Sequence, residues 1–155
     1  MSTEASSSAT QTPTTATPTP QKTFNLACHC GNVKFQADLD QDLGKSGRCN
    51  CSSCFITRLW AHPVTNLDSF KLLSSEDTVS VYNYASKRVD HYFCKTCGTQ
   101  TYLKTDIPGY GKFIYVSINC LQGLTQEQFA AIPIHSYANG AEDKHHETPK
   151  FTNHL

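Results

Sequence analysis

The chain has 155 residues, enough for one domain with a sizeable core, and its 13 basic and 13 acidic residues cancel. This balance argues against direct nucleic-acid binding, and no apolar run approaches the ~18 residues that a membrane span needs. The eight cysteines follow no secretory signal. They therefore predict metal binding in a reducing compartment, cytoplasmic or nuclear, in preference to a disulfide framework.

The two ends of the chain differ in composition from the middle. Residues 1–22 are almost all Ser, Thr, Pro, Ala and Gln. They predict a disordered tail, because they cannot bury enough apolar surface to offset the entropy of ordering. A folded domain is expected over 23–140. After Pro133 the chain becomes polar and rich in histidine, so 141–155 is expected to form a polar C-terminal extension.

The middle of the chain predicts an all-β fold with one or two short helices. Short aromatic and β-branched runs alternate with Asn, Asp, Gly and Pro. The expected strands cover 24–28, 33–37, 59–62, 70–73, 79–84, 90–93, 99–104 and 113–118. One helical turn is expected over 52–57, with Ser52 or Ser53 as its N-cap. A second helix is expected over 125–131, where Thr125 and Gln128 have the spacing of a capping box.

Seven of the cysteines fall into three tight groups. A glycine follows the second cysteine of the first and third groups, as in zinc knuckles, where the bend needs the positive φ that glycine tolerates. Phe55 stands at that place after the middle group. We therefore predict one structural four-cysteine site made of Cys28, Cys30, Cys94 and Cys97. Zinc is the expected ion because it favours four sulfur ligands in a tetrahedron.

The middle group supplies three further thiolates, Cys49, Cys51 and Cys54. A fourth ligand could be Cys120, a histidine, water or a substrate. A protein ligand would close a second structural site, whereas an open position is the format of a reactive one. Cys120 follows the apolar run 113–118, where a buried, inert cysteine is a common outcome. The residues themselves leave these alternatives open.

The order of these motifs resembles a known family. Cys28-His29-Cys30-Gly31, the cluster 49–54, the pair Tyr82-x-Tyr84 and the stretch 92–99 follow one another as in the glutathione-dependent formaldehyde-activating enzyme family, which includes the domain of centromere protein V. The resemblance covers about 24 to 121. It implies a small zinc-stapled β-tent fold with the structural zinc named above. It also implies a second zinc, on Cys49, Cys51 and Cys54, that meets a glutathione sulfur.

The expected function is that of a zinc-dependent carbon–sulfur lyase or synthase acting on glutathione adducts. It would use two zinc ions per chain and glutathione as co-substrate, with the three middle cysteines as the catalytic centre. Zinc bound by three thiolates can hold a fourth thiol deprotonated, and the thiolate is the nucleophile in sulfur chemistry.

Other side chains near these motifs could assist. Arg48 and Arg58 flank the middle cluster and could bind a glutathione carboxylate, or they could be solvated surface charges. His62, His91 and Tyr92 are candidate proton carriers, with a packing role as the alternative. Two other functions stay open. One is a non-catalytic protein-interaction module, and the other is a purely structural double-zinc domain.

Overall fold

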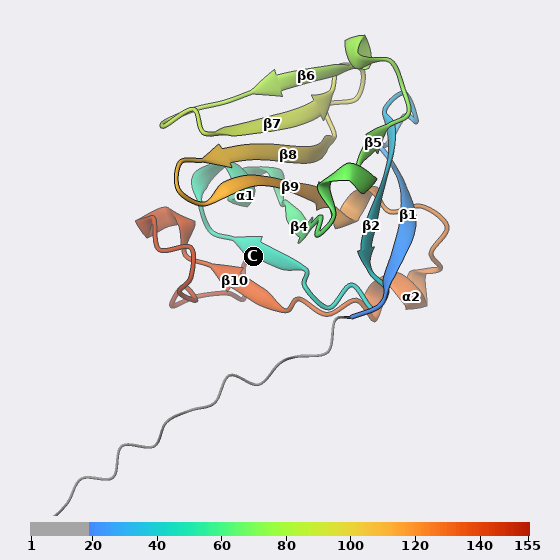
Figure 1. The fold of residues 1–155 in the computed structure, drawn as a ribbon. Coiled ribbons are helices and arrows are strands. Elements are labelled where there is room, and N and C mark those ends of the chain that lie inside the picture. Colours follow the sequence, from blue (N-terminus) through green and yellow to red (C-terminus); the bar gives the residue numbers. More distant parts are fainter. Residues whose placement is uncertain (1–18) are drawn as a thin grey trace, which may run out of the picture.

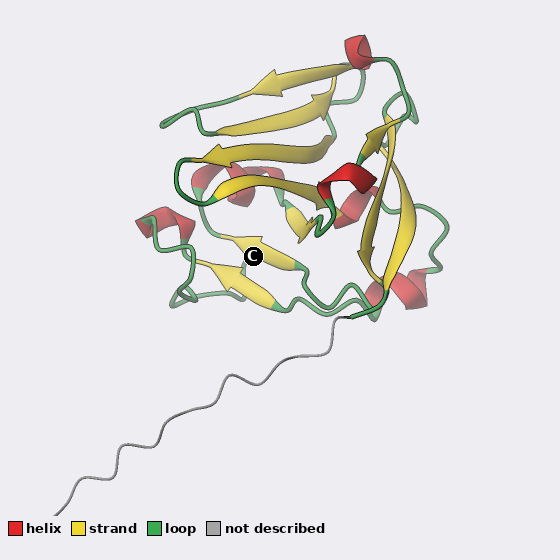
Figure 2. Cartoon of the chain, viewed as in Figure 1, coloured by secondary structure: helices red, strands yellow, loops and turns green. Residues whose placement is uncertain are grey.

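The computed structural model describes residues 19–155, so most of the predicted tail lies outside it. The strands form two sheets (Figure 1). The smaller has the order β1-β2-β5, and the larger has the order β10-β3-β4-β9-β8-β7-β6. Only two short α-helices accompany the strands in the described part, which confirms the all-β prediction. Figure 2 shows the strands in yellow and the short helical segments, 3-10 turns included, in red.

The elements have the following bounds. The smaller sheet contains β1 (Gln21–Ala27), β2 (Lys34–Asp40) and β5 (Lys71–Leu72). The larger contains β3 (Gly47–Cys49), β4 (Trp60–Pro63), β6 (Val79–Tyr82), β7 (Val89–Cys94), β8 (Gln100–Ile107), β9 (Gly111–Ser117) and β10 (Ser136–Ala138). The helices are α1 (Ser52–Thr57) and α2 (Gln126–Ala130), with 3-10 turns η1 (Leu67–Ser69), η2 (Glu76–Thr78), η3 (Ile118–Cys120) and η4 (Gly140–Glu142).

The hydrophobic core lies between the two sheets and contains buried residues from both of them. Strand β1 buries Phe24 and Leu26 while Thr23 and Asn25 stay exposed, as the alternation of a strand requires. Leu26 is paired with Phe35 of β2, so both point to the same face. The Phe35 ring packs 5.5 Å from that of Tyr102 on β8. This apolar face joins the smaller sheet to the larger one.

Each predicted strand corresponds to an observed one, although the ends differ. Strand β1 begins at Gln21, before the predicted domain start at 23. Strand β8 continues to Ile107, because its hairpin with β9 pairs Ile107 with Gly111. Sequence patterns missed β3 and β10. These strands have three residues each and pair in parallel, from Gly47 with Ser136 to Cys49 with Ala138.

The two predicted helices are present, but one predicted cap was wrong. Thr125 and Gln128 form the expected capping box of α2. The N-cap of α1 is Cys51 instead of Ser52 or Ser53, and it makes no side-chain cap bond. The reason is that the Cys51 sulfur faces the cysteine cluster. Arg58 is the C-cap of α1 and adopts the left-handed conformation with φ of 53°.

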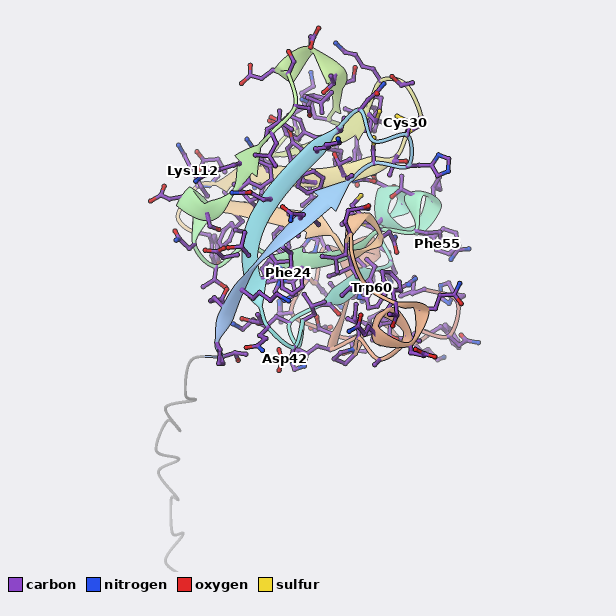
Figure 3. All side chains as sticks on the ribbon, turned by 90° about the vertical axis from the view of Figure 1, so that its right-hand side faces the viewer. Phe24, Cys30, Asp42, Phe55, Trp60 and Lys112 are labelled. Atoms are coloured by element: carbon purple, nitrogen blue, oxygen red, sulfur yellow. The ribbon has the colours of Figure 1, made fainter. Side chains whose placement is uncertain are left out.

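The C-terminal extension predicted for 141–155 folds back onto the domain. It begins with η4, next to a bridge between Asn139 and Lys144. Its last residues reach α1, where the Arg58 guanidinium donates a hydrogen bond to the carbonyl of His154. The His154 ring lies 5.6 Å from that of Phe55, which projects outward from α1 in Figure 3.

Candidate functional site

The first cysteine cluster joins two distant hairpins. Its members are Cys28, Cys30, Cys94 and Cys97, whose sulfur atoms all lie within 4.8 Å of one another. Cys28 and Cys30 come from the turn between β1 and β2, and Figure 3 shows Cys30 at the tip of this hairpin. Cys94 ends β7, and Cys97 lies in the turn after it. The structure therefore brings together the four residues that the sequence pairs.

Backbone bends aim these sulfurs inward. Gly31 and Gly98 have φ of 78° and 72°, the positive values that the knuckle pattern predicts. The amide of Val33 donates to the Cys28 sulfur at 3.2 Å. The Cys30 sulfur lies 3.5 Å from that of Cys28 and 3.6 Å from that of Cys94. Zinc–sulfur bonds of about 2.3 Å imply sulfur–sulfur separations of about 3.8 Å in a tetrahedron, so the donor set fits zinc.

The second cluster consists of Cys49, Cys51 and Cys54, with sulfur atoms again within 4.8 Å of one another. Cys49 ends β3 and Cys54 lies in the first turn of α1. The amide of Cys51 approaches the Cys49 sulfur at 3.4 Å. Among residues 19–155, no fourth cysteine, histidine or carboxylate completes this group. The donor set fits three of the four positions of a tetrahedral zinc.

Cys120 lies elsewhere. It is fully buried at the end of η3, and its sulfur faces the Gln100 carbonyl at 3.7 Å. Burial raises the pKa of its thiol to about 12, and the cysteines close enough to add to this shift are Cys28 and Cys97 of the first cluster. Cys120 is therefore a core residue on the side of the first cluster.

Cys51 is the sulfur of the second cluster with the most hydrogen-bond support. Hydrogen bonds from Cys49 and then Cys54 lower the pKa of Cys51. The Tyr84 hydroxyl also donates to the Cys51 sulfur, at 3.7 Å. Burial, and next the contact with Cys51, raise the pKa of Tyr84 to about 12, so Tyr84 stays a donor at neutral pH. The Tyr82-x-Tyr84 motif belonged to the family resemblance, but the sequence did not predict this contact.

A loop from the C-terminal region supports the second cluster. Asn50 holds this loop, because its side chain donates to Asn139 at 3.0 Å and accepts from the amide of Ala141 at 2.8 Å. Between them, Gly140 lies so close that a Cβ atom there would stand 2.5 Å from the Cys49 sulfur. Sequence reasoning missed Asn139 and Gly140. The only local signal was a glycine next to an asparagine, which is common in turns.

Both predicted arginines lie beside the second cluster. Arg48 and Arg58 line a hollow of about 10 Å³ together with Cys49, Cys54 and Leu155. The Arg48 guanidinium lies over the Trp60 ring at 5.4 Å, and its buried Nε has no hydrogen-bond partner among the described residues. The structure thus places two cations beside two of the sulfurs, under the C-terminal segment.

The three candidate proton carriers have different surroundings. His91 lines a larger hollow beside α1, and its Nδ1 lies 2.9 Å from the Gln100 side-chain nitrogen. Tyr92 points to the other face of β7 and stacks on Tyr102 at 4.5 Å. His62 is fully buried, with its Nε2 3.7 Å from the Asp40 carboxylate. Packing therefore accounts for Tyr92 and His62, and only His91 lies at the site.

Burial lowers the pKa of both His62 and His91, so both imidazoles are neutral near pH 7. In the part of the chain that the structure covers, no helix is long and apolar enough to span a membrane.

The chain is similar in sequence to proteins of other organisms. A protein of Penicillium rubens named "Putative glutathione-dependent formaldehyde-activating enzyme" is 27% identical over 130 residues, which cover 77% of this chain. One of Phaeosphaeria nodorum with the same name is 25% identical over 112 residues, or 68% of this chain. The matches span 65% and 58% of those relatives.

A solved structure shares the fold. A crystal structure of a Rhodobacter sphaeroides protein matches with a TM-score of 0.60 at 22% identity, over 74% of this chain and 99% of that one. The family model described as glutathione-dependent formaldehyde-activating enzyme matches residues 23–138. Since this match includes all seven clustered cysteines, the chain belongs to the glutathione-dependent formaldehyde-activating enzyme family.

Proposed function

We propose that this protein is a zinc-dependent carbon–sulfur lyase or synthase that acts on glutathione adducts at the second cysteine cluster. The observation that carries the proposal is the incomplete ligand set. Three sulfurs converge there, and no fourth ligand joins them from the described residues. The first cluster, with its four sulfurs, would hold a structural zinc that joins the β1–β2 hairpin to β7.

The second cluster would act by binding glutathione through its sulfur. Cys49, Cys51 and Cys54 would hold the zinc ion, which would stabilise a fourth thiol as the thiolate, the nucleophilic form. Tyr84 supports this chemistry because its hydroxyl donates to the Cys51 sulfur and so offsets part of the negative charge of the thiolates.

Arg48 and Arg58 would orient glutathione through one of its carboxylates. Guanidinium groups bind carboxylates by parallel N–H bonds, and both arginines line one hollow beside Cys54. Arg58 already donates to the His154 carbonyl, and the hollow holds about 10 Å³. That space suffices for about one water molecule. A carboxylate can therefore enter only when the C-terminal segment moves aside.

His91 would carry the proton. When a thiolate sulfur adds to an aldehyde carbon, the carbonyl oxygen gains one proton and a hemithioacetal results; cleavage returns that proton. Burial lowers the pKa of His91, so its ring is neutral near pH 7 and can accept the proton in cleavage, whereas in the addition the protonated ring would donate it. Its place beside Tyr84, with ring centres 5.7 Å apart, supports this role. A cytoplasmic location follows from the need to keep seven thiolate ligands reduced.

Glutathione binding tests the proposal. Zinc-loaded protein should bind glutathione much more tightly than S-methylglutathione, which cannot become a thiolate, in a calorimetric titration. Cys120→Ser is the matched control, and it should keep both zinc ions and this preference because Cys120 lies outside the second cluster. Equal affinity for the two ligands would contradict the proposal. Absence of binding would favour the non-catalytic interaction module instead.

A further inference from the structure

A second, larger hollow opens beside α1, with a volume of about 380 Å³. Its walls come from α1, from β6 and β7, and from the turn that begins β8. The apolar and aromatic lining includes Ile56, Tyr82, Tyr84 and Phe93. Of this lining, the proposed function uses only His91 and Tyr84.

The hollow carries no full charge. Its lining, taken from the described residues, includes no Asp, Glu, Lys or Arg. Its one histidine, His91, has a pKa that burial lowers. Glutathione has two carboxylates and an ammonium group, which need charged or strongly polar partners. The backbone of glutathione is therefore a poor occupant for this hollow and a better one for the side where Arg48 and Arg58 lie.

The two hollows lie on opposite faces of α1. At 3.6 residues per turn, Ser52, Ser53 and Ile56 share one face of the helix, and they line the larger hollow. Cys54, Phe55 and Arg58 lie on the other face, and they line the small hollow. The second cluster sits between them at the start of the helix. Tyr84 connects it to the larger hollow, because its ring lines the wall while its hydroxyl donates to Cys51.

Two exposed residues of the lining, Ile56 and Tyr82, are large and mainly apolar. Ile56 is 77% exposed and Tyr82 is 56% exposed. The Tyr82 ring stacks on that of Tyr84 with a centre distance of 5.8 Å and an interplanar angle of 15°. Flat, stacked rings beside an aliphatic side chain form a surface that an aryl or branched alkyl group can cover. Covering it would remove this apolar surface from water.

We propose that the larger hollow binds the apolar group that the electrophile brings to the adduct, so that the substrate is the glutathione adduct of an aromatic or bulky aliphatic aldehyde. This inference rests on the proposed function, since it requires the glutathione sulfur at the second cluster. Size supports it. Formaldehyde has two heavy atoms, whereas the hollow of about 380 Å³ is far larger than the roughly 10–15 Å³ of such space that one water molecule needs.

The test compares two thioethers of glutathione, S-benzylglutathione and S-methylglutathione, by calorimetric titration of the zinc-loaded full chain. Neither can become a thiolate, so the difference between them measures the hollow alone. S-benzylglutathione should bind about tenfold or more tightly, since one methylene in an apolar pocket already discriminates by about tenfold. Tyr82→Ser and Ile56→Ser should each remove most of this advantage. Both side chains are exposed, so the fold should tolerate the changes.

A tyrosine outside the hollow provides the matched control. Tyr110 is 81% exposed, in the turn between β8 and β9, and Tyr110→Ser should leave the benzyl advantage unchanged. Equal affinity for the two thioethers, or an advantage that survives both substitutions in the hollow, overturns the inference. Glutathione would still bind better than S-methylglutathione in that case, and the proposed function would stand. If glutathione binds no better than S-methylglutathione, the proposed function is wrong, whatever the comparison of the two thioethers shows.

Discussion

Substitution of Gly140 by alanine should selectively weaken zinc binding at the second cluster. A Cβ atom at this position would lie 2.5 Å from the Cys49 sulfur, 3.0 Å from the Cys51 Cβ and 3.1 Å from a ring carbon of His145. Comfortable contacts between such atoms are about 3.5–4.0 Å, so the loop or the sulfur must shift by about 1 Å. Gly140 is not among the glycines with positive φ, so alanine adds crowding without backbone strain.

The expected loss follows from the cost of overpacking. Forced insertion of a methyl group into a close-packed site costs about 1–3 kcal/mol. If the shift falls on Cys49, the affinity for the second zinc should drop by about 5- to 150-fold. The first cluster is built from other elements and should keep its ion. The variant should therefore retain one zinc at chelator concentrations where the native protein retains two.

The assay is elemental analysis after dialysis against graded concentrations of a chelator, with thermal melting beside it. Gly44→Ala is the matched control, because a Cβ there also meets an atom at 3.0 Å, but that atom is the end of the flexible Asp42 side chain. The control should keep both ions. A Gly140→Ala protein with two zinc ions at native affinity would refute the reasoning, as would one that loses both ions together.

Three further changes probe other parts of the structure. Cys97→Ser should lower the melting temperature by far more than Cys51→Ser, because the first cluster joins two hairpins and structural metal binding is coupled to folding; equal losses would show that both sites hold the fold. Removal of residues 151–155 should free Arg58 and tighten glutathione binding by about fivefold, and unchanged affinity would exclude a covering role for this segment. Burial lowers the pKa of His62 in the folded chain. Below about pH 6.5 the imidazole is therefore protonated more fully in the unfolded chain than in the folded one, so the unfolding free energy should fall as the pH drops. This slope should be smaller in His62→Gln, measured by denaturant titration between pH 5 and 7, and an unchanged slope would assign it to other groups.

Local features of the chain were predictable because they depend on a few neighbouring residues. The Cys28–Cys30 and Cys94–Cys97 pairs each bring two sulfurs close by spacing alone, and the glycine after each pair has the positive φ that the pattern requires. The capping box of α2 is local in the same way, since it joins residues three positions apart. The strands from aromatic and β-branched runs were also predictable, within a few residues at their ends.

The surroundings of each site were not predictable, because they depend on which strands become neighbours. Strands β3 and β10 pair in parallel across almost ninety residues, and this pairing carries Gly140 to the Cys49 sulfur. Strands of three residues are too short to show a periodic pattern, so the sequence does not indicate such a contact. The pattern that predicts β7 cannot say which of its faces borders a hollow. His91 lines the hollow beside α1, whereas Tyr92 packs into the core.

Three features of this protein follow from the sequence alone: two sets of cysteines that could hold metal ions, the pairing of the first set, and a mainly β domain to carry them. The burial of Cys120 in the core, the contact of His62 with Asp40 and the two hollows of opposite character beside α1 became clear only from the packed fold. These features join residues that lie far apart along the chain. Covalent spacing constrains atoms only within a turn or two, whereas the surroundings of the second cluster include Tyr84, from the segment after β6, and Gly140, from the loop after β10, which the tertiary fold brings next to the sulfurs.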